Sequence, residues 1–301
     1  MCFVGWMTLA QPAGAVVVIS GGPNNTAAGA PPFFENVGTL NSASAIYLGN
    51  GWVLTANHVA SSLPGSVNFG GIGYATEVGS FRRLTNPDFP PALSTFTDIV
   101  LFRLSAPPAL PGLEIADVTP TVGSQVTMMG NGLIQQSSPT FWNRTVIVGD
   151  NNDTWVEVPE NSSNIGGFQT TGSREVRWGE NLVNRTNLIA NVGTVQNPIH
   201  VISITTQFNS PGLAQEAQAV AGDSGGAVFS FDGNSWELSG MMFAVSEFEM
   251  QPGGTSSAIF GQETAIADLS YYREEILSII PEPSAAVLAL LGGLGLFRRR
   301  R

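Results

Sequence analysis

The chain has 301 residues, of which 43% are hydrophobic and only 12% are charged, so it is long and apolar enough for one or two domains with a buried core, and its composition excludes a disordered chain. Its net charge is −11, and all 12 of its basic residues are arginine, four of them at Arg298–Arg301. Setting aside those four and Glu282 leaves 8 Arg against 22 acids, or −14, which excludes a basic nucleic-acid-binding face.

The chain begins with a short apolar stretch, MCFVGWMTLAQPAGA, which closes in Ala13-Gly14-Ala15. An apolar run ending in small residues at alternate positions is typical of a signal peptide and its cleavage site, so residues 1–15 are predicted to be removed on export. The usual positive residues before the run are missing, and a first β-strand is the alternative. The only cysteine, Cys2, lies in this stretch, which excludes an intramolecular disulfide and a Cys/His zinc site.

The body consists of short apolar segments rich in Val, Ile and Thr, separated by turn residues. Spacing of this kind predicts an all-β sandwich or barrel rather than βαβ units. Apolar positions at helical spacing predict one late helix at 269–280. The predicted strands are SAIYLG (44–49), GWVLTA (51–56), DIVLFRL (98–104), QVTMMG (125–130), RTVIVG (144–149), HVISITTQF (200–208), GAVFSF (226–231) and LSGMMFAV (238–245).

A Pro-rich connection, APPALPGL at 106–113, separates a first part of the body at about 16–110 from a second part at about 115–280. The region 143–198 is rich in Asn, Gly and Thr, and we expect extended surface loops or an added hairpin there. Its Asp150-Asn151-Asn152-Asp153 cluster offers oxygen ligands but lacks the glycine and distal glutamate of an EF-hand loop. The cluster is therefore expected to be a solvated turn.

The C-terminal segment 281–301 joins Pro281-Glu282-Pro283, an uncharged Ala/Leu/Gly run and an arginine cluster. The run is short for a membrane span, which takes about 20 residues, and the arginines at its end would stay on the cytoplasmic side. This three-part pattern resembles the PEP-CTERM sorting signal of Gram-negative bacteria. The resemblance implies an exosortase partner that removes the tail, transient membrane contact through the tail, and an extracellular or cell-surface location.

A serine lies in a glycine-rich turn, Gly222-Asp223-Ser224-Gly225-Gly226, and only two histidines, His58 and His200, are available to activate it. In α/β-hydrolases the histidine follows the serine in the chain, whereas both histidines here precede Ser224. The subtilisin order of Asp, His and Ser excludes His58, because no aspartate precedes Asp88. His200 fits that order formally, but it lies in an alternating apolar strand with no local acid.

The third order, His, Asp and Ser, is complete. His58 follows GWVLTAN, Asp98 begins DIVLFRL, and Ser224 is the centre of GDSGG. These segments resemble the three signatures of trypsin/chymotrypsin-like serine proteases, and the likeness extends over residues about 40–280. It implies an all-β fold of two antiparallel six-stranded β-barrels of trypsin-like type with a C-terminal helix, a protease domain at 16–280, and an active site between the barrels.

The chemistry of these residue types agrees with that order. A serine hydroxyl is a weak nucleophile until a base takes its proton, and histidine titrates near neutrality. An anionic acceptor on the other ring nitrogen fixes the tautomer and stabilises the imidazolium. His58 is therefore the expected base, Asp98 its orienting partner and Ser224 the nucleophile. Gly222 permits a tight turn, so that the N–H groups of Gly222 and Ser224 can converge on an oxyanion.

Some positions depart from the family pattern. Asn57 and Val59 replace the alanine and cysteine that flank the histidine in the family. The family's equivalent of Asp223 often pairs with an N-terminus freed by zymogen cleavage. Here no basic cleavage site precedes Ile19-Ser20-Gly21-Gly22, whereas signal-peptide removal would make Val16 the first residue. The sequence alone therefore leaves the partner of Asp223 open.

Four residues are expected in the substrate pocket, namely Gln218, Phe243, Ala244 and Val245. Gln218 stands six residues before Ser224, where trypsin-like enzymes carry a pocket aspartate, so strict cleavage after Arg or Lys is not expected. Val245 would narrow the pocket mouth, which favours small or medium apolar P1 side chains. An intrusion of Glu216 into the pocket is the alternative.

Together these features predict an exported serine endopeptidase that hydrolyses protein or peptide substrates through an acyl-enzyme, with no metal or organic cofactor. An ester or a polysaccharide-linked substrate is also compatible with the same residues. One alternative is a non-catalytic surface protein on the same fold, which binds through the cleft or through 143–198. Another is a structural matrix protein recruited by the tail. The presence of all three triad residues and the oxyanion glycine favours the enzyme.

Overall fold

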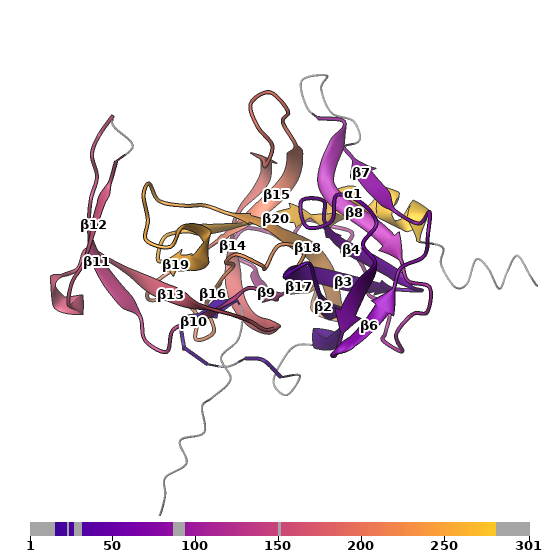
Figure 1. Cartoon of the computed structure of the whole chain (residues 1–301), viewed down its shortest axis with the longest axis horizontal. Coiled ribbons are helices and arrows are strands. Elements are labelled where there is room, and N and C mark those ends of the chain that lie inside the picture. Colours follow the sequence, from indigo (N-terminus) through magenta and orange to yellow (C-terminus); the bar gives the residue numbers. More distant parts are fainter. Residues whose placement is uncertain (1–15, 23, 27–31, 87–93, 150–151, 281–301) are drawn as a thin grey trace, which may run out of the picture.

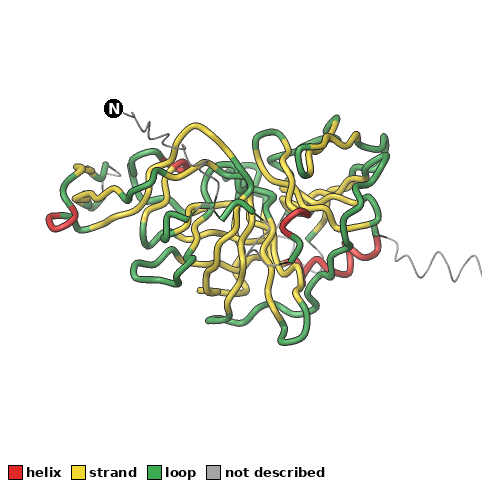
Figure 2. The backbone as a smooth tube through the Cα atoms, turned by 90° about the horizontal axis from the view of Figure 1, so that it is seen from below, coloured by secondary structure: helices red, strands yellow, loops and turns green. Residues whose placement is uncertain are grey.

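The computed structural model describes residues 16–22, 24–26, 32–86, 94–149 and 152–280, so the predicted signal peptide and sorting tail lie outside the described residues. Strands dominate and form a central barrel, with a second sheet on one side and a projecting hairpin on the other (Figure 1). Helical segments are few (Figure 2). Within the described ranges, no helix is both long enough and apolar enough to cross a membrane.

The first half of the chain forms a seven-stranded antiparallel sheet in the order β6-β5-β2-β3-β4-β8-β7. Between β3 and β4, Asn50 and Gly51 both have positive φ, as a tight two-residue hairpin turn requires. Because β4 returns along β3, the chain reaches His58 directly after the central strands. The strands are β2 (Val37–Leu40), β3 (Ala43–Gly49), β4 (Trp52–Ala56), β5 (Ser66–Phe69), β6 (Ile72–Ala75), β7 (Arg82–Thr85) and β8 (Phe96–Arg103).

The second half forms a closed six-stranded barrel, β14-β15-β20-β18-β17-β9. Fully buried apolar side chains such as Met128, Val228 and Ile266 fill one of its cores. The turn that carries Ser224 runs into β17, so the barrel wall holds the end of that turn. The strands are β9 (Gln125–Gly130), β14 (Arg177–Asn191), β15 (His200–Gln207), β17 (Ala227–Phe231), β18 (Trp236–Val245) and β20 (Glu263–Asp268).

Of the two expected six-stranded barrels, only the one in the second half is therefore closed. The first-half sheet has seven strands and stays open, because its edge strands β6 and β7 are only four residues long and do not pair with each other. An isolated bridge between Thr76 and Leu104 joins the chain beyond β6 to the chain beyond β8. The short β1 (Val17–Val18) pairs with β16 (Ala217–Gln218), so the first described residues pack with the second half.

The region 143–198 is mostly strand, so of the two expectations for it the added hairpin is confirmed and the extended surface loops are not. It contains much of the β11–β12 hairpin, nearly all of which projects to one side in Figure 1, and then β13 and the barrel strand β14. The predicted strand at 144–149 is wrong beyond Thr145, because Val146 and Val148 lie exposed in a turn with no core to cover them. The five-stranded sheet here is built from β10 (Leu133–Gln135), β11 (Thr140–Thr145), β12 (Thr154–Glu157), β13 (Ile165–Arg174) and β19 (Ser257–Ile259).

The hairpin is braced by a charged and aromatic cluster. Arg144 forms a salt bridge with Asp153 at 2.6 Å, and its guanidinium lies 4.6 Å from the ring centre of Phe248. Asp153 is buried, so this end of the predicted acidic turn is not solvated as expected. The residues 150–151 lie outside the described residues.

The helix α1 (Leu269–Ile279) appears where the sequence predicts it and contacts both halves of the molecule, against β18 and β7. Asp268 caps it by accepting the backbone N–H of Ser270 at 3.1 Å. Its buried face is Leu269, Tyr272 and Ile276, a helical spacing. The remaining helical pieces are the 3₁₀ turns η1 (Phe34–Asn36), η2 (Glu160–Ser162) and η3 (Gly254–Ser256).

The Tyr272 hydroxyl links the helix to both sheets. It accepts the backbone N–H of Ile202 at 2.9 Å and donates to Asn86 Oδ1 at 2.8 Å, and burial raises its pKa to about 12. We expect Tyr272→Phe to lower the free energy of unfolding by about 1–3 kcal/mol, because buried polar partners lose their hydrogen bonds. Urea denaturation measures this loss. Tyr74→Phe is the matched control, since the Tyr74 hydroxyl bonds to no described residue, and an equal loss in both variants would contradict the assignment.

Candidate active site

His58 and Asp98 meet at the ends of two paired strands of the first sheet. β4 and β8 pair with each other; His58 lies just after β4, and Asp98 lies near the start of β8. Asp98 Oδ2 lies 2.6 Å from His58 Nδ1, and Asp98 Oδ1 accepts the backbone N–H of His58 at 3.0 Å. The Asp98 side chain is buried, whereas that of His58 is 45% exposed. One ring nitrogen is therefore fixed by an anion, and Nε2 is available for chemistry.

Ser224 comes from the second half of the chain, in the turn between β16 and β17. It lines a cavity of about 400 Å³ together with His58. Among the described residues its Oγ has one hydrogen bond, a long one of 3.5 Å to the carbonyl of Phe243, and none to His58. The structure thus joins His58 to Asp98 directly and brings Ser224 to the same cavity without a bond to the imidazole. Catalytic hydrogen bonds are often long without substrate and tighten when it binds.

The turn from residue 221 to residue 224 has all of its backbone carbonyls occupied. Arg174 donates to the Ala221 carbonyl, and Ser44 Oγ donates to that of Gly222 at 2.9 Å. The backbone N–H of Gly226 donates to the Asp223 carbonyl at 2.8 Å, and that of Ser44 donates to the Ser224 carbonyl at 2.9 Å. By contrast, the N–H groups of Gly222 and Ser224 donate to no acceptor within the described residues. Two free donors at the wall of the cavity are what an oxyanion needs.

Two glycines of this turn are required by the geometry. Gly222 has φ +102° and Gly225 has φ +83°, conformations that side chains rarely adopt. A Cβ on Gly222 would collide with Arg174 Nη1, and one on Gly225 would collide with the Ser44 carbonyl and the Thr55 hydroxyl. The turn is therefore wedged against both the first sheet and the strand that ends in Arg174.

Asp223 lies beneath the turn and is completely buried. Burial raises the pKa of its carboxyl to about 7, although backbone N–H groups and the charge of Arg174 act in the opposite direction. The N–H donors are those of Val220 and Gly132, both at 2.8 Å, and of Val16. The sequence left the partner of Asp223 open, and the structure places the backbone nitrogen of Val16 there.

The cavity beside Ser224 has mainly apolar walls. Phe243, Ala244 and Val245 are among its lining residues, and no charged side chain other than a protonated His58 lies among them. The other lining residues are Ala219, Val220, Ala221, Gly222, Met242 and Thr255. A side chain entering this cavity would meet mainly apolar side chains, together with the hydroxyls of Ser224 and Thr255 and the imidazole of His58.

Gln218 does not line this cavity, in contrast to the expectation from its position in the sequence. It is fully buried in β16 opposite Val17, and neither polar atom of its amide has a partner among the described residues. The β1 strand therefore packs where a pocket floor was predicted. Glu216 does not enter the cavity either, because its carboxylate accepts the N–H groups of Leu213 and Asn209.

The second histidine lies elsewhere. His200 Nδ1 accepts the backbone N–H of Ser94 at 2.9 Å, and the backbone N–H of His200 donates to Ser94 Oγ at 2.8 Å. It does not line the cavity of Ser224. The subtilisin order that His200 satisfies formally therefore has no support in space.

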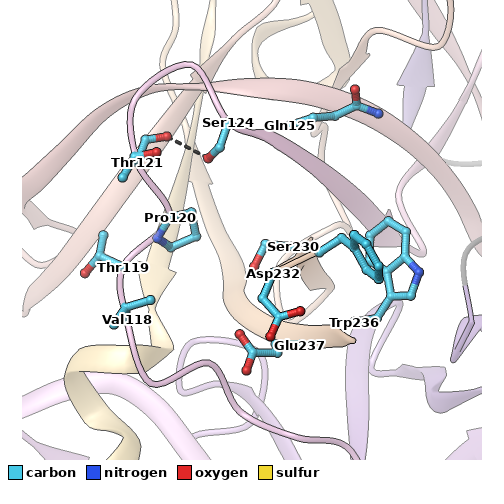
Figure 3. A pocket seen from close by; sticks show the side chains of 11 residues that line it. Val118, Thr119, Pro120, Thr121, Ser124, Gln125, Ser230, Asp232, Trp236 and Glu237 are labelled. Atoms are coloured by element: carbon cyan, nitrogen blue, oxygen red, sulfur yellow. Dashed lines mark hydrogen bonds between the residues drawn. The ribbon is translucent and has the colours of Figure 1, made fainter. Parts of the chain in front are cut away.

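A separate cavity of about 650 Å³ lies on the barrel, between the segment 118–125 and the β17–β18 hairpin (Figure 3). The carboxylates of Asp232 and Glu237 face it beside Trp236. Partial burial and the neighbouring acids raise the pKa of Glu237. This cavity shares no lining residue with that of Ser224, and no group of three or more metal-ligating residues occurs in the described ranges.

Sequence reasoning missed two contributors to the site, Ser44 and Arg174, and left the part of Val16 open. A serine near the start of a strand and an arginine at the end of one are ordinary patterns, so neither carried a signal. Val16 did carry one, since it follows the predicted signal-peptide cleavage site. Only the folded chain shows that its nitrogen reaches Asp223.

No protein-family model and no curated protein match this chain. Among solved structures, it is similar to the inactive form of the Rv3671c protease of M. tuberculosis, with 14% sequence identity and a TM-score of 0.45, over 83% of this chain and 91% of that one. It is also similar to neuropsin, a serine protease of mouse brain, with 16% identity and a TM-score of 0.46, over 84% and 97% of the two chains. A third similar structure is the murine norovirus NS6 protease, with 13% sequence identity and a TM-score of 0.39, over 79% of this chain and 99% of that one. An activity for this chain has to follow from its own side chains.

Proposed function

We propose that the chain is an exported serine endopeptidase that hydrolyses peptide bonds through an acyl-enzyme. The observation that supports this most is the 2.6 Å contact between His58 and a buried Asp98, beside a cavity that also holds Ser224. The free N–H groups of Gly222 and Ser224 add the oxyanion donors that acyl transfer requires. His58 and Ser224 come from two separate halves of the fold and line one cavity, and Asp98 contacts the imidazole of His58.

In the proposed reaction, Ser224 Oγ attacks the scissile carbonyl carbon while His58 Nε2 takes its proton. Asp98 holds the ring through Nδ1 and stabilises the imidazolium. The carbonyl oxygen becomes an oxyanion that accepts the N–H groups of Gly222 and Ser224. His58 then protonates the leaving amine, and a water molecule, deprotonated by the same ring, hydrolyses the acyl-enzyme.

The substrate preference follows from the cavity walls. Val220, Met242 and Val245 surround the space beside Ser224, and no acid lies among the lining residues. Small or medium apolar P1 side chains therefore fit better than arginine or lysine, whose charge would be buried without a partner.

Export is part of the proposal. Removal of residues 1–15 would turn the Val16 nitrogen, which already donates to Asp223, into an ammonium group. A buried carboxylate gains a counter-charge in this way, and no separate zymogen cleavage is needed. The tail at 281–301 would contact the membrane transiently and be removed by an exosortase.

Labelling with a fluorophosphonate probe tests the nucleophile. We expect the full chain to be labelled, Ser224→Ala to remain unlabelled and His58→Ala to be labelled much more slowly. The control is Ser235→Ala, which removes a serine from the β17–β18 turn and should label like the wild type. Equal labelling of wild type and Ser224→Ala would contradict the assignment of the nucleophile, and a folded wild type that takes up no probe would favour the non-catalytic binding protein.

A further inference from the structure

Arg174 lies behind the peptide that joins Ala221 to Gly222. It is the last residue of β13, and its Nη1 donates to the Ala221 carbonyl. The same nitrogen occupies the space that a Cβ on Gly222 would take. The hydrogen bond and the close approach to Gly222 both place this guanidinium against one face of the turn.

No salt bridge holds the Arg174 guanidinium elsewhere within the described residues. Its charge acts on Asp223 at a distance, through the coulombic interaction that lowers the pKa of that carboxyl. The partly buried Arg174 side chain therefore donates its one direct hydrogen bond to the Ala221 carbonyl. A charge-assisted bond of this kind is roughly twice as strong as a neutral one.

We propose that Arg174 is a positioning residue for the oxyanion site, an inference that rests on the proposed protease function. In a planar trans peptide the C=O and N–H groups point in opposite directions. Anchoring the Ala221 carbonyl on Arg174 therefore aims the Gly222 N–H away from the guanidinium, and that N–H is one of the two free donors at the cavity. The positive charge of the guanidinium beside the Ala221 carbonyl oxygen also polarises this peptide group. The polarisation strengthens the Gly222 N–H as a donor.

Steady-state kinetics on the full chain test the role. We expect Arg174→Gln to lower kcat about 10–100-fold with KM within twofold, because a misplaced donor loses part of the 10²–10³ that one oxyanion donor supplies. Arg174→Lys, which keeps a charged donor, should recover part of that loss. Arg273→Gln is the matched control, since Arg273 also donates to a backbone carbonyl, that of Ile115, and should leave kcat unchanged.

Two kinetic results would overturn the proposal. One is a kcat within threefold of wild type for Arg174→Gln. The other is a raised KM with unchanged kcat, which would make Arg174 a contact for a carboxylate on the substrate.

A second readout does not depend on turnover. We expect Arg174→Gln to move the ¹H and ¹⁵N resonances of the Gly222 amide, whereas Arg273→Gln leaves them in place. An unmoved Gly222 amide in Arg174→Gln would overturn the positioning role. Failure of the proposed function is recognised separately, by a folded wild type that takes up no fluorophosphonate. The Gly222 amide resonances test the role of Arg174 even in that case.

Discussion

Replacing Asp98 with asparagine is expected to lower kcat about 10⁴-fold and to leave KM nearly unchanged. The two oxygens of Asp98 have different partners, since Oδ1 accepts the His58 backbone N–H and Oδ2 faces Nδ1 of the ring. An asparagine keeps its oxygen on the backbone N–H, which leaves its NH₂ group facing Nδ1. The ring then carries its proton on Nε2, the nitrogen that has to accept the proton of Ser224.

A chromogenic peptide with a medium apolar P1 residue, assayed near pH 8, measures this loss. Asp232→Asn is the control, because Asp232 lies at the other cavity and its replacement should leave kcat within twofold of wild type. The thermal midpoint of each variant shows whether the fold is kept. A loss smaller than 10-fold in a folded Asp98→Asn would mean that Asp98 does not orient the base.

The first residue of the chain is expected to set how stability depends on pH. In a chain that retains Ala15, burial raises the pKa of the Asp223 carboxyl from its ordinary value of 3.8 to about 7 in the folded state. The folded state therefore binds more protons than the unfolded state between these values, and its stability falls as pH rises from about 4 to about 7. The fall is on the order of 1 kcal/mol per pH unit, so it amounts to a few kcal/mol in all, and it levels off above pH 7.

A chain that begins at Val16 should behave differently. Its ammonium group would lie where the Val16 N–H now meets Asp223, and an opposite charge at that distance lowers the pKa of the carboxyl. The fall in stability between pH 4 and pH 7 should therefore shrink or disappear. Urea denaturation of both chains at four pH values measures it.

The control for this prediction is the pair of chains carrying Asp223→Asn, in which the difference between the two starting residues should vanish. Because that variant removes buried hydrogen-bond acceptors, acetylation of the Val16 amine offers a second test. Acetylation should restore the pH dependence of the longer chain. Identical pH profiles for chains beginning at Ala15 and at Val16 would show that Asp223 does not bind the N-terminus.

The sequence by itself determined the features that depend on local pattern. The short apolar segments GWVLTA and DIVLFRL, bounded by turn residues, predicted β4 and β8, and helical spacing predicted α1, because such patterns are carried by neighbouring residues. The order of His58, Asp98 and Ser224 was readable for the same reason, since each lies in a short segment of recognisable composition. The strand predicted at 144–149 fails beyond Thr145, where the fold leaves the apolar run without a strand partner.

Only the tertiary structure decided the features that depend on partners far apart in the chain. Closure of the second half and not of the first depends on which edge strands meet. Gln218 was predicted to line the pocket, but pairing with Val17 buries it in β16. Ser44 and Arg174 occupy the carbonyls around Ser224 from strands 180 and 50 residues away in sequence. Hydrogen bonds between such distant groups leave no periodic trace in a sequence, because each needs only one donor in the right place once the chain has folded.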